Sequence, residues 1–259
     1  MITQVNPPEI YTILEESEEW VKIQLANNVG WIHQDYFAII EDQSASDSDE
    51  LTEEESLSEP KTTEMKDAET NATEITVQTN GISGKRIVID PGHGGRDVGA
   101  IGASEGFESY YTLDTALVMK QVLEDYGAEV YLTRNQDRYN PLTSRVTFAN
   151  LYQADVFLSV HYNSTPEYPS AQGMDTFYFS ERDQQLASYI HEGLIASTDA
   201  RDRGVTQRDL QVLRTNHRPS LLLELGFLSN ETEENRIQSR VYLEAMSRGV
   251  VNGLQQYFK

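Results

Sequence analysis

Three apolar stretches of the sequence each lead to a residue that can bind a metal ion or transfer a proton. An Arg-Ile-Val-Ile-Asp-Pro-Gly stretch precedes His93, Val-Phe-Leu-Ser-Val precedes His161, and Leu-Leu-Leu precedes Glu224. Apolar runs of this kind are typical of buried parallel strands. The carboxyl ends of such strands meet at one edge of a sheet, where open α/β sheets bind their ligands. Two imidazoles and a carboxylate at that edge predict a metal site.

A zinc ion with two imidazole ligands needs a third protein ligand and an open position for water. The acids nearest His93 in the sequence are Asp97, Glu105 and Glu108. Glu108 is favoured because it opens the helix expected to follow the first strand, and Glu105 is the fallback. The alternative role of Glu108 is that of an ordinary acid in the first turn of a helix, stabilised by the helix dipole.

Glu224 follows three leucines, and a carboxylate in such a place is costly to bury unless it is paired or used in chemistry. Beside a metal ion it can act as a general base that takes a proton from water. The alternative is a structural carboxylate bonded to backbone amides or to an arginine, for which Arg134, Arg145 and Arg214 are candidates. The other histidines are interpreted as surface, helix-edge or loop residues: His33, His191 and His217.

Composition excludes several classes of protein. The chain of 259 residues has a formal net charge of −22, which argues against nonspecific binding to nucleic acid or to an anionic bilayer. It has no cysteine, so disulfides, thiolate ligands and a cysteine nucleophile are excluded. No stretch is long and apolar enough for membrane insertion. The first nine residues lack the basic and apolar regions of a signal peptide, so a protein exported by this route would have its signal outside this chain.

From residue 84 onward, strand-like and helix-like segments alternate. This pattern predicts an α/β fold with a mostly parallel twisted sheet flanked by helices on both faces. Strands are expected at 85–90, 128–133, 155–161, 174–179 and 221–225, and helices at 108–126, about 143–153, 180–198, 231–237 and 241–257. Thr143 or Ser144 and Ser180 are expected to cap two of the helices. Segments around Val205 and 210–213 remain ambiguous.

The preceding sequence divides into two parts. Residues 1–40 predict a small all-β segment with a tight turn at Asn27-Asn28. Its Glu-Glu-Trp-Val-Lys-Ile and Gly-Trp-Ile-His stretches resemble the second half of a bacterial SH3 domain, which implies binding to peptidoglycan or peptides; a remnant without binding is the alternative. Residues 41–83 predict a disordered acidic linker, because 41–74 alone contain thirteen acids and two lysines.

The C-terminal region, 84–259, resembles the zinc-dependent N-acetylmuramoyl-L-alanine amidases of the amidase-3 type. The matching stretches are Ile-Asp-Pro-Gly-His-Gly-Gly from residue 89, Leu-Thr-Arg from 132, Leu-Ser-Val-His-Tyr-Asn-Ser from 158 and Leu-Glu-Leu-Gly-Phe-Leu-Ser-Asn from 223. The resemblance implies that His93, Glu108 and His161 hold one Zn²⁺ and that Glu224 is the catalytic carboxylate. The implied reaction is hydrolysis of the amide bond between the lactyl group of N-acetylmuramic acid and L-alanine.

The resemblance also implies that the substrate is peptidoglycan, and hence action in the extracellular space or cell wall of a bacterium. A monomer is expected. Asn163 and Arg214 could position the substrate. An open site is expected, because Phe179-Ser180-Glu181 runs straight into a helix and leaves no room for the inhibitory helix found in some members. The alternatives are a zinc carboxypeptidase acting on stem peptides and a catalytically inactive wall-binding protein. A phosphate-binding loop at residues 92–95 lacks the motifs that would support it.

Overall fold

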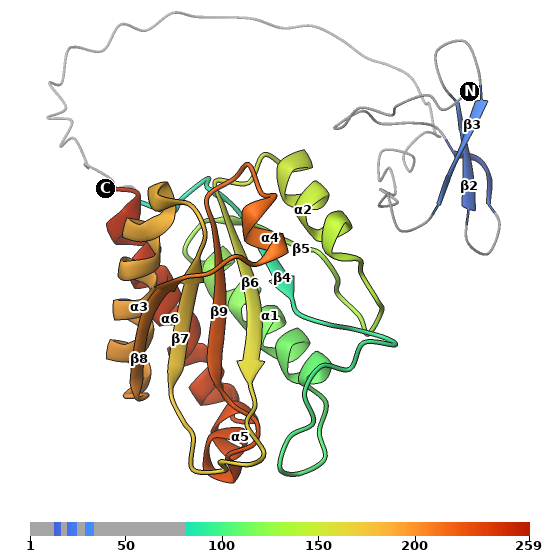
Figure 1. Cartoon of the computed structure of the whole chain (residues 1–259). Coiled ribbons are helices and arrows are strands. Elements are labelled where there is room, and N and C mark those ends of the chain that lie inside the picture. Colours follow the sequence, from blue (N-terminus) through green and yellow to red (C-terminus); the bar gives the residue numbers. More distant parts are fainter. Residues whose placement is uncertain (1–12, 17–19, 25–28, 34–80) are drawn as a thin grey trace, which may run out of the picture.

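The computed structural model describes residues 13–16, 20–24, 29–33 and 81–259. The last range forms a six-stranded sheet in the order β5-β4-β6-β9-β7-β8 (Figure 1). Its strands are β4 (Arg86–Pro91), β5 (Glu129–Leu132), β6 (Val156–Asn163), β7 (Met174–Tyr178), β8 (Asp202–Gln207) and β9 (Ser220–Phe227).

Four neighbouring strands are parallel, and the sheet reverses direction once. β5, β4, β6 and β9 run the same way, whereas β7 is antiparallel to β9 and β8 is parallel to β7. The carboxyl ends of β4, β6 and β9 therefore lie at one edge, together with the amino ends of β7 and β8. This arrangement confirms the expected mostly parallel sheet.

Helices cover both faces of the sheet (Figure 1). They are α1 (Glu108–Asp125), α2 (Leu142–Leu151), α3 (Gln184–Thr198), α4 (Gln211–Arg214), α5 (Glu231–Ile237) and α6 (Arg240–Tyr257). One hydrophobic cluster joins the sheet to α1, α3 and α6. A smaller cluster joins the opposite face to α2 and α4. Alternate residues of each buried strand belong to the two clusters on opposite faces of the sheet. This explains why the sequences of these strands are apolar almost throughout.

Two expectations about helix caps were wrong. α2 begins at Leu142 with Pro141 as its N-cap residue and no side-chain cap, so neither Thr143 nor Ser144 caps it. Ser180 makes no cap either: a 3₁₀ turn, Glu181–Asp183, comes before α3. Between β7 and α3 this fully described stretch holds only that short 3₁₀ turn and no inserted α-helix, as expected.

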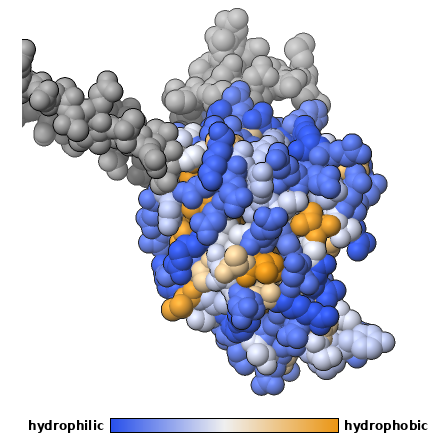
Figure 2. Space-filling view, turned by 90° about the vertical axis from the view of Figure 1, so that its left-hand side faces the viewer, coloured by the Kyte–Doolittle hydropathy of each residue, from blue (hydrophilic) through white to orange (hydrophobic). Residues whose placement is uncertain are grey.

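The ambiguous segment around Val205 is the edge strand β8. Four of its six residues are exposed, so it lacks the apolar pattern of the inner strands. Figure 2 shows the side of the molecule that carries α3 and β8: it is mainly hydrophilic, with separate small hydrophobic patches. Within the described part of the chain, no helix combines the length and apolar character required to cross a membrane.

Residues near the N-terminus form a separate three-stranded antiparallel sheet of β1 (Ile13–Glu16), β2 (Trp20–Gln24) and β3 (Val29–His33). Their antiparallel pairing agrees with the expected small β segment, whereas the turn expected at Asn27-Asn28 lies outside the described residues and the likeness to a bacterial SH3 domain stays a prediction. Most of the expected acidic linker, 41–80, lies outside the described residues. Its last part does not behave as a linker, because Ile82 is fully buried in the larger hydrophobic cluster.

Candidate metal centre

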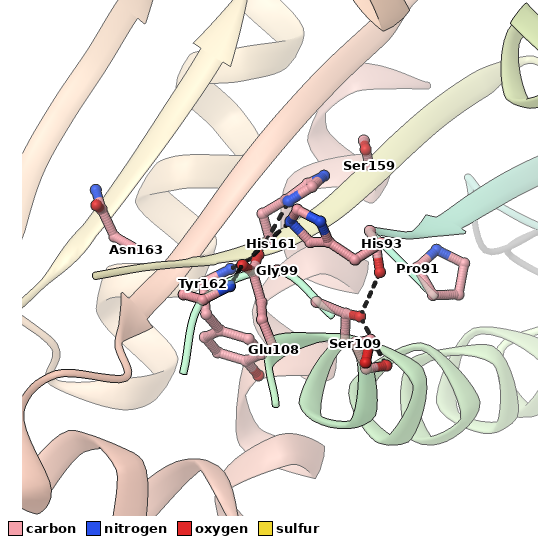
Figure 3. Close-up of polar contacts among 12 residues, drawn as sticks. Pro91, His93, Gly99, Glu108, Ser109, Ser159, His161, Tyr162 and Asn163 are labelled. Atoms are coloured by element: carbon pink, nitrogen blue, oxygen red, sulfur yellow. Dashed lines mark hydrogen bonds and ion pairs between the residues drawn. The ribbon is translucent and has the colours of Figure 1, made fainter. Parts of the chain in front are cut away.

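His93, Glu108 and His161 meet at the carboxyl edge of the sheet (Figure 3). His93 lies two residues beyond the end of β4, His161 lies near the end of β6, and Glu108 is the first residue of α1. One ligand atom from each residue can be chosen so that all three lie within 4.8 Å of one another. The structure thus brings together three side chains separated by up to 68 positions in the sequence.

The two imidazoles approach the Glu108 carboxylate from different sides. His93 Nε2 lies 3.1 Å from Oε2 of Glu108, and His161 Nδ1 lies 3.0 Å from Oε1. Two donors bound tetrahedrally at about 2.1 Å from one zinc ion would lie about 3.4 Å apart. The observed histidine–glutamate distances are of that order, although they involve the two different carboxylate oxygens and the set of three ligand atoms extends to 4.8 Å.

Asp97 fixes the orientation of the first imidazole. Its Oδ1 lies 2.9 Å from His93 Nδ1, so that Nε2 is the ring nitrogen directed toward Glu108. Metal-binding histidines are commonly oriented in this way by a carboxylate on the other nitrogen. Burial acts to lower the pKa of His93, but the hydrogen bonds and charges of Glu108 and Asp97 outweigh it and raise that pKa.

Glu108 is 4 % exposed, yet it is held as a carboxylate. Its Oε2 accepts a hydrogen bond from Ala100 N at 2.9 Å, and its Oε1 accepts one from Tyr162 N at 3.1 Å. Burial acts to raise its pKa, but the contacts with His161 and His93 dominate and hold the pKa well below the usual range. A buried anion between two imidazoles is a suitable ligand for a divalent cation.

Two glycines leave the space that the imidazoles occupy. A β-carbon on Gly92 would lie 2.3 Å from Cε1 of His161, and one on Gly99 would lie 2.6 Å from Oε2 of Glu108. Any larger residue at either position would displace a member of the cluster. Gly92 of the Pro-Gly-His-Gly-Gly stretch and Gly99 are thus both required by this close approach.

Glu224 lies beside the cluster on the next strand. It is the register partner of His161 in the parallel pair β6–β9, so both side chains project from the same face of the sheet. Its Oε2 is buried and has no hydrogen-bond partner. Burial raises the pKa of Glu224 to about 7, against the opposing charge of His161. The structural alternative, pairing with an arginine, does not occur among the described residues.

Arg134 and Arg145 instead bind the backbone that carries His93. Arg145 Nη2 donates to the His93 carbonyl at 2.7 Å, and Arg134 Nη2 donates to the Gly92 carbonyl at 2.7 Å. This role could not be inferred from the sequence, because every residue has a backbone carbonyl and the residue type does not show which one accepts a hydrogen bond. The only signal was that arginines so close to buried strands need acceptors.

Other candidate residues lie away from the cluster. Glu105 is exposed in the turn before α1, and Asn163 lies apart from the three ligands (Figure 3), with Oδ1 accepting from Ser164 N at 2.9 Å. Arg214 pairs with Asp209 in the connection that leads to the amino end of β9, so the structure does not bring it to this site.

His191 and His217 do not take part in the site, as expected, whereas the side chain of His33 lies outside the described part of the chain. His191 is buried, with its ring nitrogens 2.9 Å from Thr176 Oγ1 and 2.9 Å from Asp202 Oδ1. His217 is exposed in a loop. Neither belongs to the cluster formed by His93, Glu108 and His161.

The donor set suits a catalytic zinc ion. Two imidazoles and one carboxylate are typical of zinc sites that keep a position open for water. The side chains of His93 and His161 are 23 % and 20 % exposed, so solvent and ligands can reach them. Glu224, whose Oε2 has no hydrogen-bond partner, is the register partner of His161 on the neighbouring strand.

The chain is similar in sequence to probable and putative cell wall amidases. The chain is 36% identical over 185 residues to a probable cell wall amidase, LytH, of Staphylococcus epidermidis, which covers 71% of this chain and 62% of that protein. It is 35% identical over 178 residues to a putative N-acetylmuramoyl-L-alanine amidase, YrvJ, of Bacillus subtilis, covering 69% of this chain and 34% of that protein. The chain thus spans less than two thirds of the length of these relatives.

Solved structures show the same fold. The catalytic domain of CwlV, an N-acetylmuramoyl-L-alanine amidase of Bacillus (Paenibacillus) polymyxa, superposes with a TM-score of 0.64 at 33% identity, covering 67% of this chain and 97% of that one. The amidase AmiC2 of Nostoc punctiforme gives 0.64 at 32% identity, covering 68% and 98%. Residues 87–256 match the model of the Amidase_3 family, described as N-acetylmuramoyl-L-alanine amidase, and the chain belongs to that family.

Proposed function

We propose that this protein is a zinc-dependent peptidoglycan hydrolase that cleaves the amide bond between the lactyl group of N-acetylmuramic acid and L-alanine of the stem peptide. The observation that carries the proposal is the unpartnered, buried Oε2 of Glu224 beside a His-Glu-His cluster. A structural carboxylate would be hydrogen-bonded, whereas a general base keeps an oxygen free for water.

In this proposal His93, Glu108 and His161 hold one Zn²⁺. When bound, zinc would supply a Lewis acid that polarises the scissile carbonyl and makes water more acidic. Glu224 accepts a proton from the attacking water and then donates it to the departing amino group of L-alanine. Asp97 keeps His93 in the tautomer whose Nε2 faces Glu108.

Substrate contacts belong to the same proposal. Asn163 Oδ1 is already used by Ser164 N, so its side-chain nitrogen is the group that can donate to a substrate carbonyl. We infer action in the bacterial cell wall, since the LytH relatives carry that designation. The protein is proposed to act as a monomer.

Digestion of purified peptidoglycan tests the proposal. We expect new L-alanine amino termini and intact sugar chains, with the activity abolished by a chelator and restored by Zn²⁺. Release of terminal D-amino acids instead would support the carboxypeptidase alternative. Binding to the wall without any cleavage by the zinc-loaded protein would support the inactive wall-binding alternative.

A further inference from the structure

Two buried guanidinium groups bind the three consecutive carbonyl groups that lead into the metal centre. Arg134 Nε donates to the Pro91 carbonyl at 3.1 Å and its Nη2 to the Gly92 carbonyl at 2.7 Å. Arg145 Nη1 donates to the Pro91 carbonyl at 2.7 Å and its Nη2 to the His93 carbonyl at 2.7 Å. We call Arg134 and Arg145 the guanidinium clamp.

The two arginines differ in how their charge is balanced. Arg145 forms a buried ion pair with Asp90, with Nη1 2.8 Å from Oδ1. Arg134 is 1 % exposed and forms no ion pair with a described carboxylate. Its further partners are neutral oxygens: the carbonyls of Gln136 and Ser109 and the hydroxyl of Thr112. Burying an unpaired cation is costly, so its position calls for a function.

The backbone that the clamp holds is in an uncommon conformation. His93 has a φ of 60°, in the left-handed region that residues with a β-carbon rarely adopt. Such conformations persist where the surrounding structure fixes them, and they concentrate at functional sites. Here the fixing contacts are the bonds from Arg134 and Arg145 to the carbonyls on both sides of the His93 nitrogen and α-carbon.

We propose that Arg134 and Arg145 are positioning residues that hold His93 in this left-handed conformation and thereby keep its imidazole directed at the metal centre. This inference rests on the proposed metal-dependent function. It assigns no contact with substrate to either arginine. Loss of a clamp contact should weaken zinc binding by letting His93 move, in the way that loss of outer-shell partners weakens other metal sites.

The test uses Arg134→Met, which keeps the aliphatic bulk and leaves no carboxylate without a partner. We expect the zinc dissociation constant, measured by competition with a chromophoric chelator, to rise by about 10- to 100-fold. The matched control is Thr133→Val, which removes the 2.5 Å bond from Thr133 Oγ1 to Asp90 in the same buried region but touches no clamped carbonyl. Its dissociation constant should stay within about threefold of the wild-type value.

A second readout does not depend on metal. Imidazole ¹⁵N resonances of the metal-free protein should shift for His93 in Arg134→Met and stay unchanged for His191, which is held by Thr176 and Asp202. If Arg134→Met does not fold, Arg134→Lys replaces it. That variant keeps the charge but cannot reach all the acceptors. We expect its zinc dissociation constant to be several-fold larger than that of the wild type, and its His93 resonances to shift less than those of Arg134→Met.

Unchanged zinc affinity and unchanged His93 resonances in the folded variant would overturn the proposal, as would an equal loss of affinity in Thr133→Val. Failure of the proposed function gives a different pattern: wild-type protein that binds no zinc or cleaves no amide bond. In that case the His93 resonances still decide whether the clamp positions the imidazole.

Discussion

Gly92 offers a direct test of the metal centre, because the space above its α-carbon is filled by the ring of His161. In Gly92→Ala the new β-carbon would lie 2.3 Å from Cε1 and 2.6 Å from both ring nitrogens. Carbon atoms are most stable at about 3.5–4.0 Å, so the ring must move by at least about 1.2 Å. Metal–ligand distances tolerate only about 0.2 Å. The imidazole therefore cannot remain a ligand.

We expect Gly92→Ala to raise the zinc dissociation constant by more than about 100-fold, beyond the effect of losing an outer-shell contact. Gly92 does not have a positive φ, so alanine is compatible with the backbone itself. The imidazole of His161 is partly exposed and can swing outward, which should limit the loss of metal-free stability to about 1–3 kcal/mol.

Competition with a chromophoric chelator measures the zinc affinity, and urea unfolding of the metal-free protein measures the stability. Gly81→Ala is the control, because its new β-carbon would approach the Gln255 carbonyl no closer than 3.3 Å and lies among residues of α6. Wild-type zinc affinity in a folded Gly92→Ala protein would refute the assignment of His161 as a ligand.

Three further predictions follow from the same geometry. Glu224→Gln keeps the side-chain volume but cannot accept a proton, so zinc affinity should be unchanged while release of stem peptides falls by about 10²- to 10⁴-fold; turnover above a tenth of wild type would reject Glu224 as the base. Glu108→Gln should weaken zinc binding by about 100-fold or more, whereas Glu105→Gln, in an exposed turn, should bind normally; calorimetry showing the reverse would make Glu105 the ligand. In the metal-free protein the pKa of Glu224 is raised to about 7 from 4.5 by burial, so the folded state holds this proton more tightly than the unfolded chain. Raising the pH from about 4.5 to about 7 should therefore lower the free energy of unfolding by up to about 3 kcal/mol relative to Glu224→Gln. The measurement is urea unfolding of both metal-free proteins across this pH range, and an equal pH dependence of the two unfolding free energies would contradict the prediction.

The fold class could be predicted because the inner strands carry a strong local signal. β4, β6 and β9 are buried on both faces, so their sequences are apolar almost throughout. β8 could not be assigned, because an exposed edge strand has no such requirement. The reversal at β7 was equally hidden, since pairing direction depends on how distant segments pack and not on local composition.

The candidate site was partly predictable for a similar reason. His93, His161 and Glu224 stand at the ends of apolar runs, and strand ends gather at one edge of the sheet. Glu108 could be favoured only by its place at the start of a helix. The roles of Arg134 and Arg145 could not be predicted, because their partners are backbone carbonyls, which every residue possesses.

Because the sheet reverses direction once, strands end on one side of β9 and begin on its other side at the edge where Glu224 lies. Just beyond the end of β4 and near the carboxyl ends of β6 and β9 lie the proposed ligands His93 and His161 and the proposed base Glu224. Segment 164–173, which leads from β6 to β7, and segment 199–201, which leads into β8, contain no proposed ligand. Insertions in those two entry segments can therefore reshape what approaches the reaction centre while the parts that perform the chemistry stay untouched. Under the proposed function, such changes could alter which part of the substrate is recognised without moving the proposed ligands or base.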